Sequence, residues 1–112
     1  MVKSLEEIYT VTLKAMKKTL GFEYASILMV ERKMLCLVAN IGYSKNLSLK
    51  LPLEGDKGIT VRVVRTGKHV FIPDVSKDKA YVEGGIDIRS ELVVPIKIGN
   101  KVLGVLNVES RK

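Results

Sequence analysis

Two apolar segments near the C-terminus, joined by a short turn, constrain the fold of this chain more than any other feature of its sequence. Residues 91–98 and 101–109 are rich in valine, leucine and isoleucine, and Gly99-Asn100 between them is typical of a tight β-hairpin turn. A two-residue turn also sets the register of the paired strands. The expected pairs are Ile98 with Lys101, Ile96 with Leu103, and Val94 with Val105. Both faces of this hairpin are then mostly apolar, which predicts a central place in an antiparallel sheet that is covered on both sides.

The first twenty residues predict an amphipathic helix. Ser4 and Glu7 have the spacing of a capping box, and Gly21 follows the periodic segment as a helix-terminating residue. Between them a mostly apolar stripe recurs at steps of three and four residues. It consists of Leu5, Ile8, Tyr9, Thr12, Leu13, Met16 and Leu20. This stripe needs a sheet or a partner helix to cover it.

The segments between this helix and the hairpin complete a single α+β domain over residues 1–112. Apolar runs bounded by turn residues predict further strands, and the stretch before Gly67 predicts a second helix. The expected strands are residues 24–30, 34–41, 47–51 and 69–72, the second helix is 59–66, and Ser76 is expected to cap a brief helical turn through Tyr81. Helix one can cover one face of the antiparallel sheet, and the loop-rich segment 55–90 must cover the other. Loops over a sheet are a natural place for a ligand pocket.

The chain shows no signal for a membrane or for export. No apolar run approaches the ~20 residues that a helix needs to cross a bilayer. Residues 1–20 carry charges throughout, instead of the apolar centre of a signal peptide. We therefore expect a cytoplasmic protein, or the cytoplasmic part of a larger one.

The formal net charge of +7 raises the question of nucleic-acid binding. The basic residues form two clusters: Lys14, Lys17 and Lys18 in the first helix, and Arg62 and Arg65 in the second. The others are scattered singly, mostly through turns, and aromatic residues, at 5% of the chain, do not interleave with arginine as they do in single-strand grooves. A solvated, charged surface accounts for this pattern, so nucleic acid is not the expected partner.

One cysteine and one histidine leave little room for metal or thiol chemistry. Cys36 has no second cysteine with which to form a disulfide, and it lies in an apolar run without a basic neighbour that would activate its thiol. His69 has no second metal-ligating residue at a suitable spacing. We expect no metal site, and the sequence identifies no cofactor.

An ordered series of short matches in the second half of the chain resembles the GAF domain family. The matches are Gly58-Ile59, Val63, Thr66-Gly67-Lys68, Val70, Ile72-Pro73-Asp74-Val75, Tyr81, residues 88–96 and residues 104–110. The resemblance implies a PAS-like central antiparallel sheet with helices behind it and a pocket in front. It also implies a non-catalytic sensory or regulatory module in signal transduction, which binds a small molecule or a protein partner.

One enzymatic alternative has the same fold, the free-methionine sulfoxide reductases. Their chemistry needs a nucleophilic thiolate and a second cysteine that resolves the oxidised form. The resemblance places the nucleophile shortly before residues 90–95, where this chain has Glu83-Gly84-Gly85 and no sulfur. This reductase and a basic nucleic-acid-binding domain are the two alternatives that the sequence disfavours, and we expect no enzyme.

Five residues are candidates for ligand binding. The resemblance implies Glu91 and Glu109, because the reductases hold a substrate amine at the corresponding positions. The expected hairpin register puts these two on opposite faces, so they converge only if a β-bulge shifts one strand by a residue; otherwise each is a strand-end residue paired with a nearby Lys or Arg. Asp74, Tyr81 and Arg89 lie on the segment expected to roof the pocket. Arg89 suits a ligand carboxylate or phosphate, or equally an ion pair with Asp74 or Asp87.

Helix one also carries an expectation about assembly. GAF domains usually continue after their final strand into a helix that packs beside the first, whereas this sequence stops at Lys112. The apolar stripe of helix one is then incompletely covered, which favours a weak homodimer through that helix. Lys14, Lys17 and Lys18 oppose a tight contact, because two-fold symmetry would bring like charges together.

Overall fold

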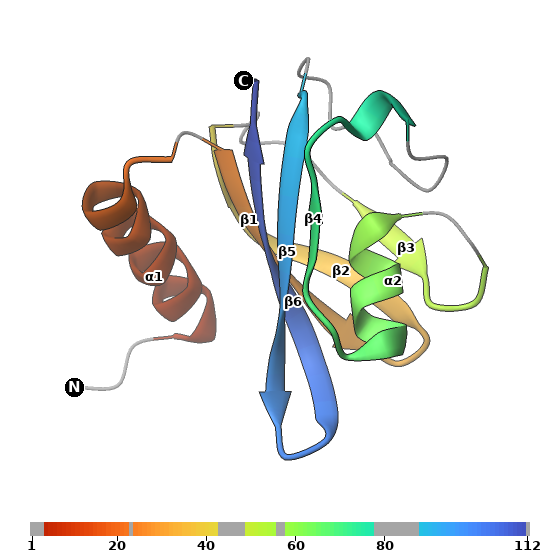
Figure 1. Cartoon of the computed structure of the whole chain (residues 1–112). Coiled ribbons are helices and arrows are strands. Elements are labelled where there is room, and N and C mark those ends of the chain that lie inside the picture. The colour runs from red at the N-terminus through yellow and green to blue at the C-terminus, as the bar shows by residue number, and fades with distance from the viewer. Residues whose placement is uncertain (1–3, 23, 43–48, 56–57, 78–87, 112) are drawn as a thin grey trace.

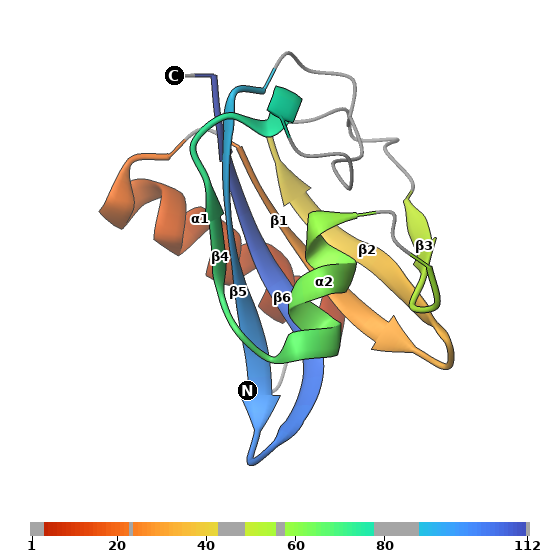
Figure 2. The same ribbon diagram turned by 45° about the vertical axis from the view of Figure 1, so that its right-hand side comes forward.

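The computed structural model describes residues 4–22, 24–42, 49–55, 58–77 and 88–111. Within these ranges, six antiparallel strands form one sheet in the order β3-β2-β1-β6-β5-β4. Helix α1 lies on one face of the sheet and helix α2 on the other (Figures 1 and 2). The elements are α1 (Leu5–Leu20), β1 (Tyr24–Glu31), β2 (Met34–Ile41), β3 (Lys50–Pro52), α2 (Ile59–Thr66), β4 (Val70–Ile72), the 3-10 turn η1 (Val75–Lys77), β5 (Ser90–Ile98) and β6 (Lys101–Ser110). This arrangement confirms the predicted α+β fold with an antiparallel sheet between helices.

Three local expectations need correction. The strand expected over 47–51 is observed as β3, which begins at Lys50, and residues 43–48 lie outside the described ranges. β4 begins at Val70 rather than at position 69. The short turn after β4 is capped by Asp74 instead of Ser76: the N–H and the hydroxyl of Ser76 both donate to Asp74 Oδ1, at 3.1 and 2.7 Å. The rest of that turn, up to Tyr81, lies outside the described residues.

Helix α1 begins and ends where its capping residues predict. Ser4 Oγ accepts a hydrogen bond from the N–H of Glu7 at 3.3 Å. Gly21 adopts a left-handed conformation with φ of 77°, and its N–H donates to the carbonyl of Lys17 at 2.8 Å. Such a cap adds about 1 kcal/mol to the stability of a helix. The two caps explain why the bounds of this element follow from the sequence alone.

The sheet separates two apolar layers. The larger layer, on the side of α2, consists of Leu28, Leu35, Leu51, Ile59, Val61, Val63, Val75, Ile88, Val93 and Val105. The smaller layer, on the side of α1, is built on Leu13, Ala25 and Ile27. Helix α1 contacts β1 and β2, whereas α2 contacts β5 and β6. The two helices therefore cover different halves of the sheet as well as different faces.

The predicted register of the β5–β6 hairpin is wrong beyond its first pairs. Ile98 pairs with Lys101 as expected, but a bulge between Ile96 and Lys97 shifts the ladder, so that Ile96 faces Gly104 instead of Leu103. A two-residue turn determines the pairing only as far as the first bulge. The bulge therefore moves every later side chain of β6 by one position relative to β5.

The position opposite Ile96 tolerates no side chain. A Cβ atom at Gly104 would collide with the carbonyl oxygen of Leu28 and with the sulfur of Met29 on the neighbouring strand β1. Gly104 lies opposite Met29 in the β1–β6 ladder, at the end of that pairing. Glycine thus permits the close approach of β6 to β1 beside the bulge.

The expectation that the hairpin is covered on both faces is only half right. Its α2 side is buried, and Val93 and Val105 have no exposed surface. On the α1 side, Val94 of β5 is 38% exposed and Phe71 of β4 is 60% exposed. Helix α1 lies over β1 and β2 and leaves this outer half of its own face open (Figure 1).

Candidate functional site

Four polar side chains lie buried together on the α2 side of the central strands. Glu91 on β5 is 5% exposed, Asn107 on β6 is 6%, Glu109 on β6 is 7%, and Ser26 on β1 is 5%. The ladders pair Glu91 with Glu109 and Ser26 with Asn107. Val93, which pairs with Asn107, packs in the α2 layer and so identifies the face. We call Ser26, Glu91, Asn107 and Glu109 the buried polar cluster.

Hydrogen bonds connect part of this cluster. The amide nitrogen of Asn107 donates to Glu109 Oε1 at 3.1 Å and to Ser26 Oγ at 3.4 Å. These two bonds orient the amide, because its nitrogen is the donor end. The amide oxygen of Asn107 is also buried and accepts no hydrogen bond from the described residues. A buried acceptor of this kind is rare in proteins and indicates a site for a donor.

The electrostatics of the cluster favour the same kind of partner. Glu91 and Glu109 lie directly opposite each other on adjacent strands, where facing Cβ atoms are about 4.5–5.5 Å apart. Two ionised carboxylates at that separation repel each other, most strongly in a buried place. The cluster therefore presents carboxylate and amide oxygens, and it suits a positively charged or donor-rich group.

The five residues predicted as ligand contacts have different outcomes in position. Glu91 and Glu109 lie opposite each other, because the β-bulge between Ile96 and Lys97 shifts the register of β6 by one residue. Arg89 has an exposed side chain, and its backbone ties the segment down: its carbonyl accepts from Val75 N at 2.7 Å and its N–H donates to the carbonyl of Ser110 at 2.8 Å. Tyr81 lies outside the described residues. None of these placements tests a ligand-binding role.

Asp74 has a structural partner in its own turn. Hydrogen bonds from the hydroxyl and the N–H of Ser76 lower the pKa of Asp74 below its ordinary value of 3.8, with smaller contributions from the charges of Lys77 and Arg89. Asp74 therefore stabilises the segment before the site.

Asn107 and Ser26 are the members of the cluster that sequence reasoning missed. Asn107 is two residues before Glu109 on the same strand, so the alternation of a strand puts both on one face. An asparagine inside an otherwise apolar strand was the available signal. The predicted register was wrong and placed Glu91 on the opposite face from Asn107, so the sequence did not group these two residues.

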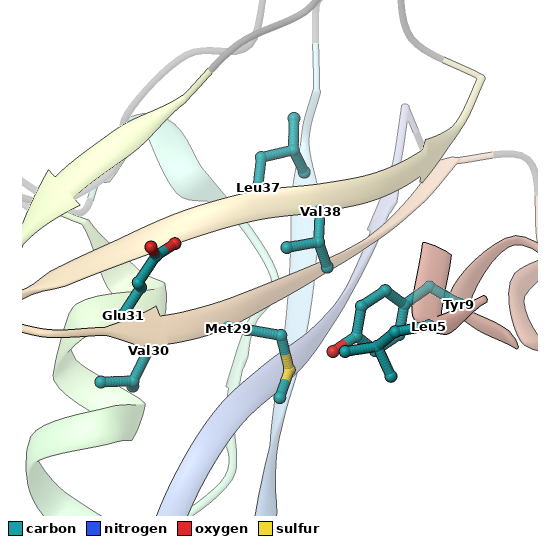
Figure 3. Close-up of a pocket in the computed structure, with 7 residues that line it drawn as sticks. All are labelled: Leu5, Tyr9, Met29, Val30, Glu31, Leu37 and Val38. Atoms are coloured by element: carbon teal, nitrogen blue, oxygen red, sulfur yellow. The ribbon is translucent and has the colours of Figure 1, made fainter. Parts of the chain in front are cut away.

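A hollow lies on the other face, between the start of α1 and strands β1 and β2. This groove has a volume of about 560 Å³ and is open to solvent. Figure 3 shows Tyr9 and Leu5 of α1 facing Met29 and Val38 of the two strands. Its lining residues are Leu5, Tyr9, Met29, Val30, Glu31, Leu37 and Val38. With one carboxylate among apolar side chains, the groove offers little polar recognition and mainly marks how loosely α1 covers the sheet.

Within the described ranges, neither helix combines the length and hydrophobicity needed to cross a membrane. No group of three histidine, cysteine, aspartate or glutamate residues in that part of the chain is arranged to hold a metal ion.

The sequence matches the family model of the GAF domain over residues 2–112. This chain belongs to the GAF domain family. The match extends over nearly the whole chain, and it confirms the resemblance that the short matches of the second half indicate.

The related sequences and structures include both regulators and an enzyme. This chain is 27% identical over 113 residues to Nif-specific regulatory proteins of Azospirillum lipoferum and Azospirillum brasilense. The match covers 94% of this chain but only 18% of the length of either relative. The GAF domain of A. aeolicus nlh2, solved in an inactive state, superposes with a TM-score of 0.84 at 26% identity, covering 98% of this chain and 70% of that one. Free methionine-R-sulfoxide reductase from Neisseria meningitidis, solved with its substrate, gives 0.83 at 21% identity over 95% and 62% of the two chains. The last likeness shows a shared fold.

Proposed function

We propose that this GAF domain is a non-catalytic sensory module of a cytoplasmic regulatory protein, and that the buried polar cluster contacts its small-molecule ligand. The observation that carries the proposal is the cluster itself: carboxylate and amide groups, each more than nine-tenths buried, on the face of the central strands where α2 packs. A buried polar atom costs stability unless it is hydrogen-bonded, and the amide oxygen of Asn107 accepts no hydrogen bond from the described residues. A bound donor group would offset that cost. The regulatory relatives support the sensory role.

The chemistry of the cluster selects the class of ligand. The acceptor that the described residues leave unused is the amide oxygen of Asn107, since the amide nitrogen already donates to Glu109 and Ser26. A primary ammonium group has three donors and a positive charge that reduces the repulsion between Glu91 and Glu109. We therefore propose an ammonium-bearing small molecule, with the ammonium group on the cluster.

The position of the cysteine supports a binding role over thiol chemistry. Cys36 pairs with Met29 in the β1–β2 ladder, and Met29 packs in the α1 layer. Paired residues share a face, so the thiol lies on the opposite side of the sheet from Glu91 and Glu109. A sulfoxide whose amine sat on the cluster would be separated from this thiol by the sheet.

Ligand binding is tested with Glu109→Gln and Glu91→Gln, which keep the shape of each side chain and remove its charge. Native mass spectrometry of the purified protein is followed by calorimetric titration with free amino acids and simple polyamines. We expect at least one ammonium compound to bind, and either variant to weaken it by roughly tenfold or more, because a hydrogen bond to a charged group contributes about 1.5–3 kcal/mol.

Glu54→Gln is the matched control, because Glu54 is an exposed carboxylate on the loop after β3. It should leave the affinity unchanged. A ligand without an ammonium group, or one whose affinity ignores both cluster variants, would contradict the proposed site. Sulfoxide reduction that depends on Cys36 would contradict the non-catalytic role.

A further inference from the structure

A row of polar side chains continues from the buried polar cluster across the central strands. Ser26 pairs with Asn107 in the β1–β6 ladder and with Asn40 in the β1–β2 ladder. Paired residues share a face of the sheet, so these three side chains lie in line across β6, β1 and β2, which are neighbours in the sheet (Figure 2). The next pair along, Ile27 with Ala39, packs in the α1 layer, so Ser26 and Asn40 face the α2 side.

The two ends of this row offer different hydrogen bonds. At the first end are the carboxylates of Glu91 and Glu109 and the buried amide oxygen of Asn107, which accepts no hydrogen bond from the described residues. At the second end, the hydroxyl of Ser26 accepts from Asn107 and keeps its own hydrogen for donation, and the half-buried amide of Asn40 has two N–H donors. We call Ser26 and Asn40 the donor end. A cation suits the first end, and a carbonyl or carboxylate oxygen suits the donor end.

The spacing of the strands sets the separation of the two ends. The carboxylates lie over β5 and β6 and the donor end over β1 and β2, so their centres are two strand spacings apart. Neighbouring strands are about 4.8 Å apart, which makes the distance between the two ends roughly 8–11 Å once the offset along the strands is included. The ammonium and carboxylate groups of an α-amino acid are joined through a single carbon, so they cannot reach both ends at once.

The surface beside the donor end is apolar. Tyr24 and Leu28 flank Ser26 along β1 on the same face, because side chains of a strand alternate between faces. Both pack in the α2 layer, and Tyr24 pairs with Glu109 across the β1–β6 ladder. An aliphatic linker between two polar groups can pack against the Tyr24 ring on its way from one end of the row to the other.

We propose that the ligand of this GAF domain is a linear molecule with an ammonium group at one end and a carboxylate or amide carbonyl at the other. The ammonium group lies on the buried polar cluster, and the carbonyl oxygen accepts hydrogen bonds from Ser26 and Asn40. An ω-amino acid has this form, and so does a peptide of two or three residues, since an extended peptide rises about 3.3–3.6 Å per residue. The inference rests on the proposed function, because it supplies the second contact of the same ligand.

Calorimetric titration with linear ligands tests the length and the second group together. The series is glycine, 4-aminobutyrate, 6-aminohexanoate and 8-aminooctanoate, with triglycine as the peptide and n-hexylamine as the amine without an acceptor. Each bond of an extended chain adds about 1.3 Å, so we expect the affinity to be highest at about six to eight carbons. 6-Aminohexanoate should bind roughly tenfold more tightly than glycine or n-hexylamine, because its carboxylate gains the hydrogen bonds of the donor end. Tighter binding of triglycine than of 6-aminohexanoate would identify peptides as the ligand class, and the reverse would identify ω-amino acids.

Asn40→Ala removes the amide of the donor end and leaves the buried polar cluster intact. It should lower the affinity for 6-aminohexanoate to nearly that for n-hexylamine. Its binding of n-hexylamine should stay unchanged, which also shows that the variant is folded. Asn100→Ala is the matched control, because Asn100 is an exposed asparagine in the β5–β6 turn, and it should change neither affinity.

The outcomes separate this inference from the proposed function. If no amine binds, or if Glu91→Gln leaves amine binding unchanged, the proposed function fails and this inference fails with it. If n-hexylamine binds the wild-type chain as tightly as 6-aminohexanoate, the cluster holds an ammonium group but the donor end makes no contact, and this inference alone is overturned. Equal weakening of both ligands by Asn40→Ala would overturn it too, because Asn40 would then support the structure instead of contacting the carboxylate.

Discussion

At the scale of single residues, the side chain of Asp74 is held by hydrogen bonds from within its own chain. Its carboxylate accepts two hydrogen bonds from Ser76, and these lower the pKa of Asp74 below 3.8. The folded-state pKa lies below the unfolded value, so ionised Asp74 stabilises the turn fully above pH 3.8, and this contribution is lost as the pH falls through the folded-state pKa. We expect the carboxyl carbon of Asp74 to titrate below its ordinary range in a nuclear magnetic resonance pH series.

The variant Ser76→Ala tests whether the hydroxyl of Ser76 lowers the pKa of Asp74. It removes the hydroxyl donor, which makes the largest contribution, and keeps the backbone donor. The pKa of Asp74 should therefore rise toward its ordinary value without reaching it. An unchanged titration curve in Ser76→Ala would show that the side-chain hydrogen bond is not what holds the carboxylate.

The candidate site itself was only partly predictable from single residues. The resemblance to the family pointed to Glu91 and Glu109, but alternation from the Gly99-Asn100 turn put them on opposite faces. The bulge beside Gly104 reverses that result, and it depends on how closely β6 approaches β1. Such a contact between distant segments leaves no local pattern that a pairing rule can use. For the same reason the partnership of Asn107 with Ser26, 81 positions away, could not be foreseen.

At the scale of elements, α1 depends on very few side chains for its attachment to the sheet. Among its described side chains, Leu13 alone is buried, within the layer formed with Ala25 and Ile27. We expect Leu13→Ala to lower the free energy of unfolding by about 3 kcal/mol, since it removes buried methyl groups and leaves a cavity. Urea denaturation measures the change.

Ile8→Ala is the comparison within the same helix. Ile8 is 46% exposed, so its truncation should cost less than about 1 kcal/mol. Equal losses in the two variants would mean that α1 is attached by its whole length. No loss in Leu13→Ala would mean that the helix is not docked as observed.

The elements were more predictable than their contacts. Both helices and the strands β1, β2, β5 and β6 have bounds within a residue or so of those expected, because caps, turns and apolar periodicity are local signals. The sequence predicts that part of the helix-one stripe stays uncovered, but it does not predict that the uncovered residues are Leu5, Ile8 and Thr12. Where α1 lies over the sheet decides which part of the stripe is covered, and that is a property of tertiary packing.

At the scale of the whole molecule, the sheet keeps the two basic clusters apart. Lys14, Lys17 and Lys18 are on α1, whereas Arg62 and Arg65 are on α2, and these helices lie on opposite faces (Figure 1). Arg65 is also engaged within its own domain, because it donates to the carbonyl of Gly55 at 2.6 Å. The basic residues of the two helices are therefore not gathered on one face of the domain.

A nucleic acid contacts one face of a small domain at a time, so it could neutralise only one of these clusters. A cluster of two or three cations releases few counterions, which predicts weak binding with a shallow dependence on salt. We expect a 20-base-pair duplex to bind no more tightly than roughly 10⁻⁴–10⁻⁶ M at physiological salt, the usual range for non-specific contacts. Fluorescence anisotropy of the labelled duplex at 50 and 200 mM salt measures this, with a scrambled duplex of equal length as the control. Nanomolar affinity that distinguishes the two sequences at the higher salt would show that this GAF domain recognises DNA, and the charge distribution would then need another explanation.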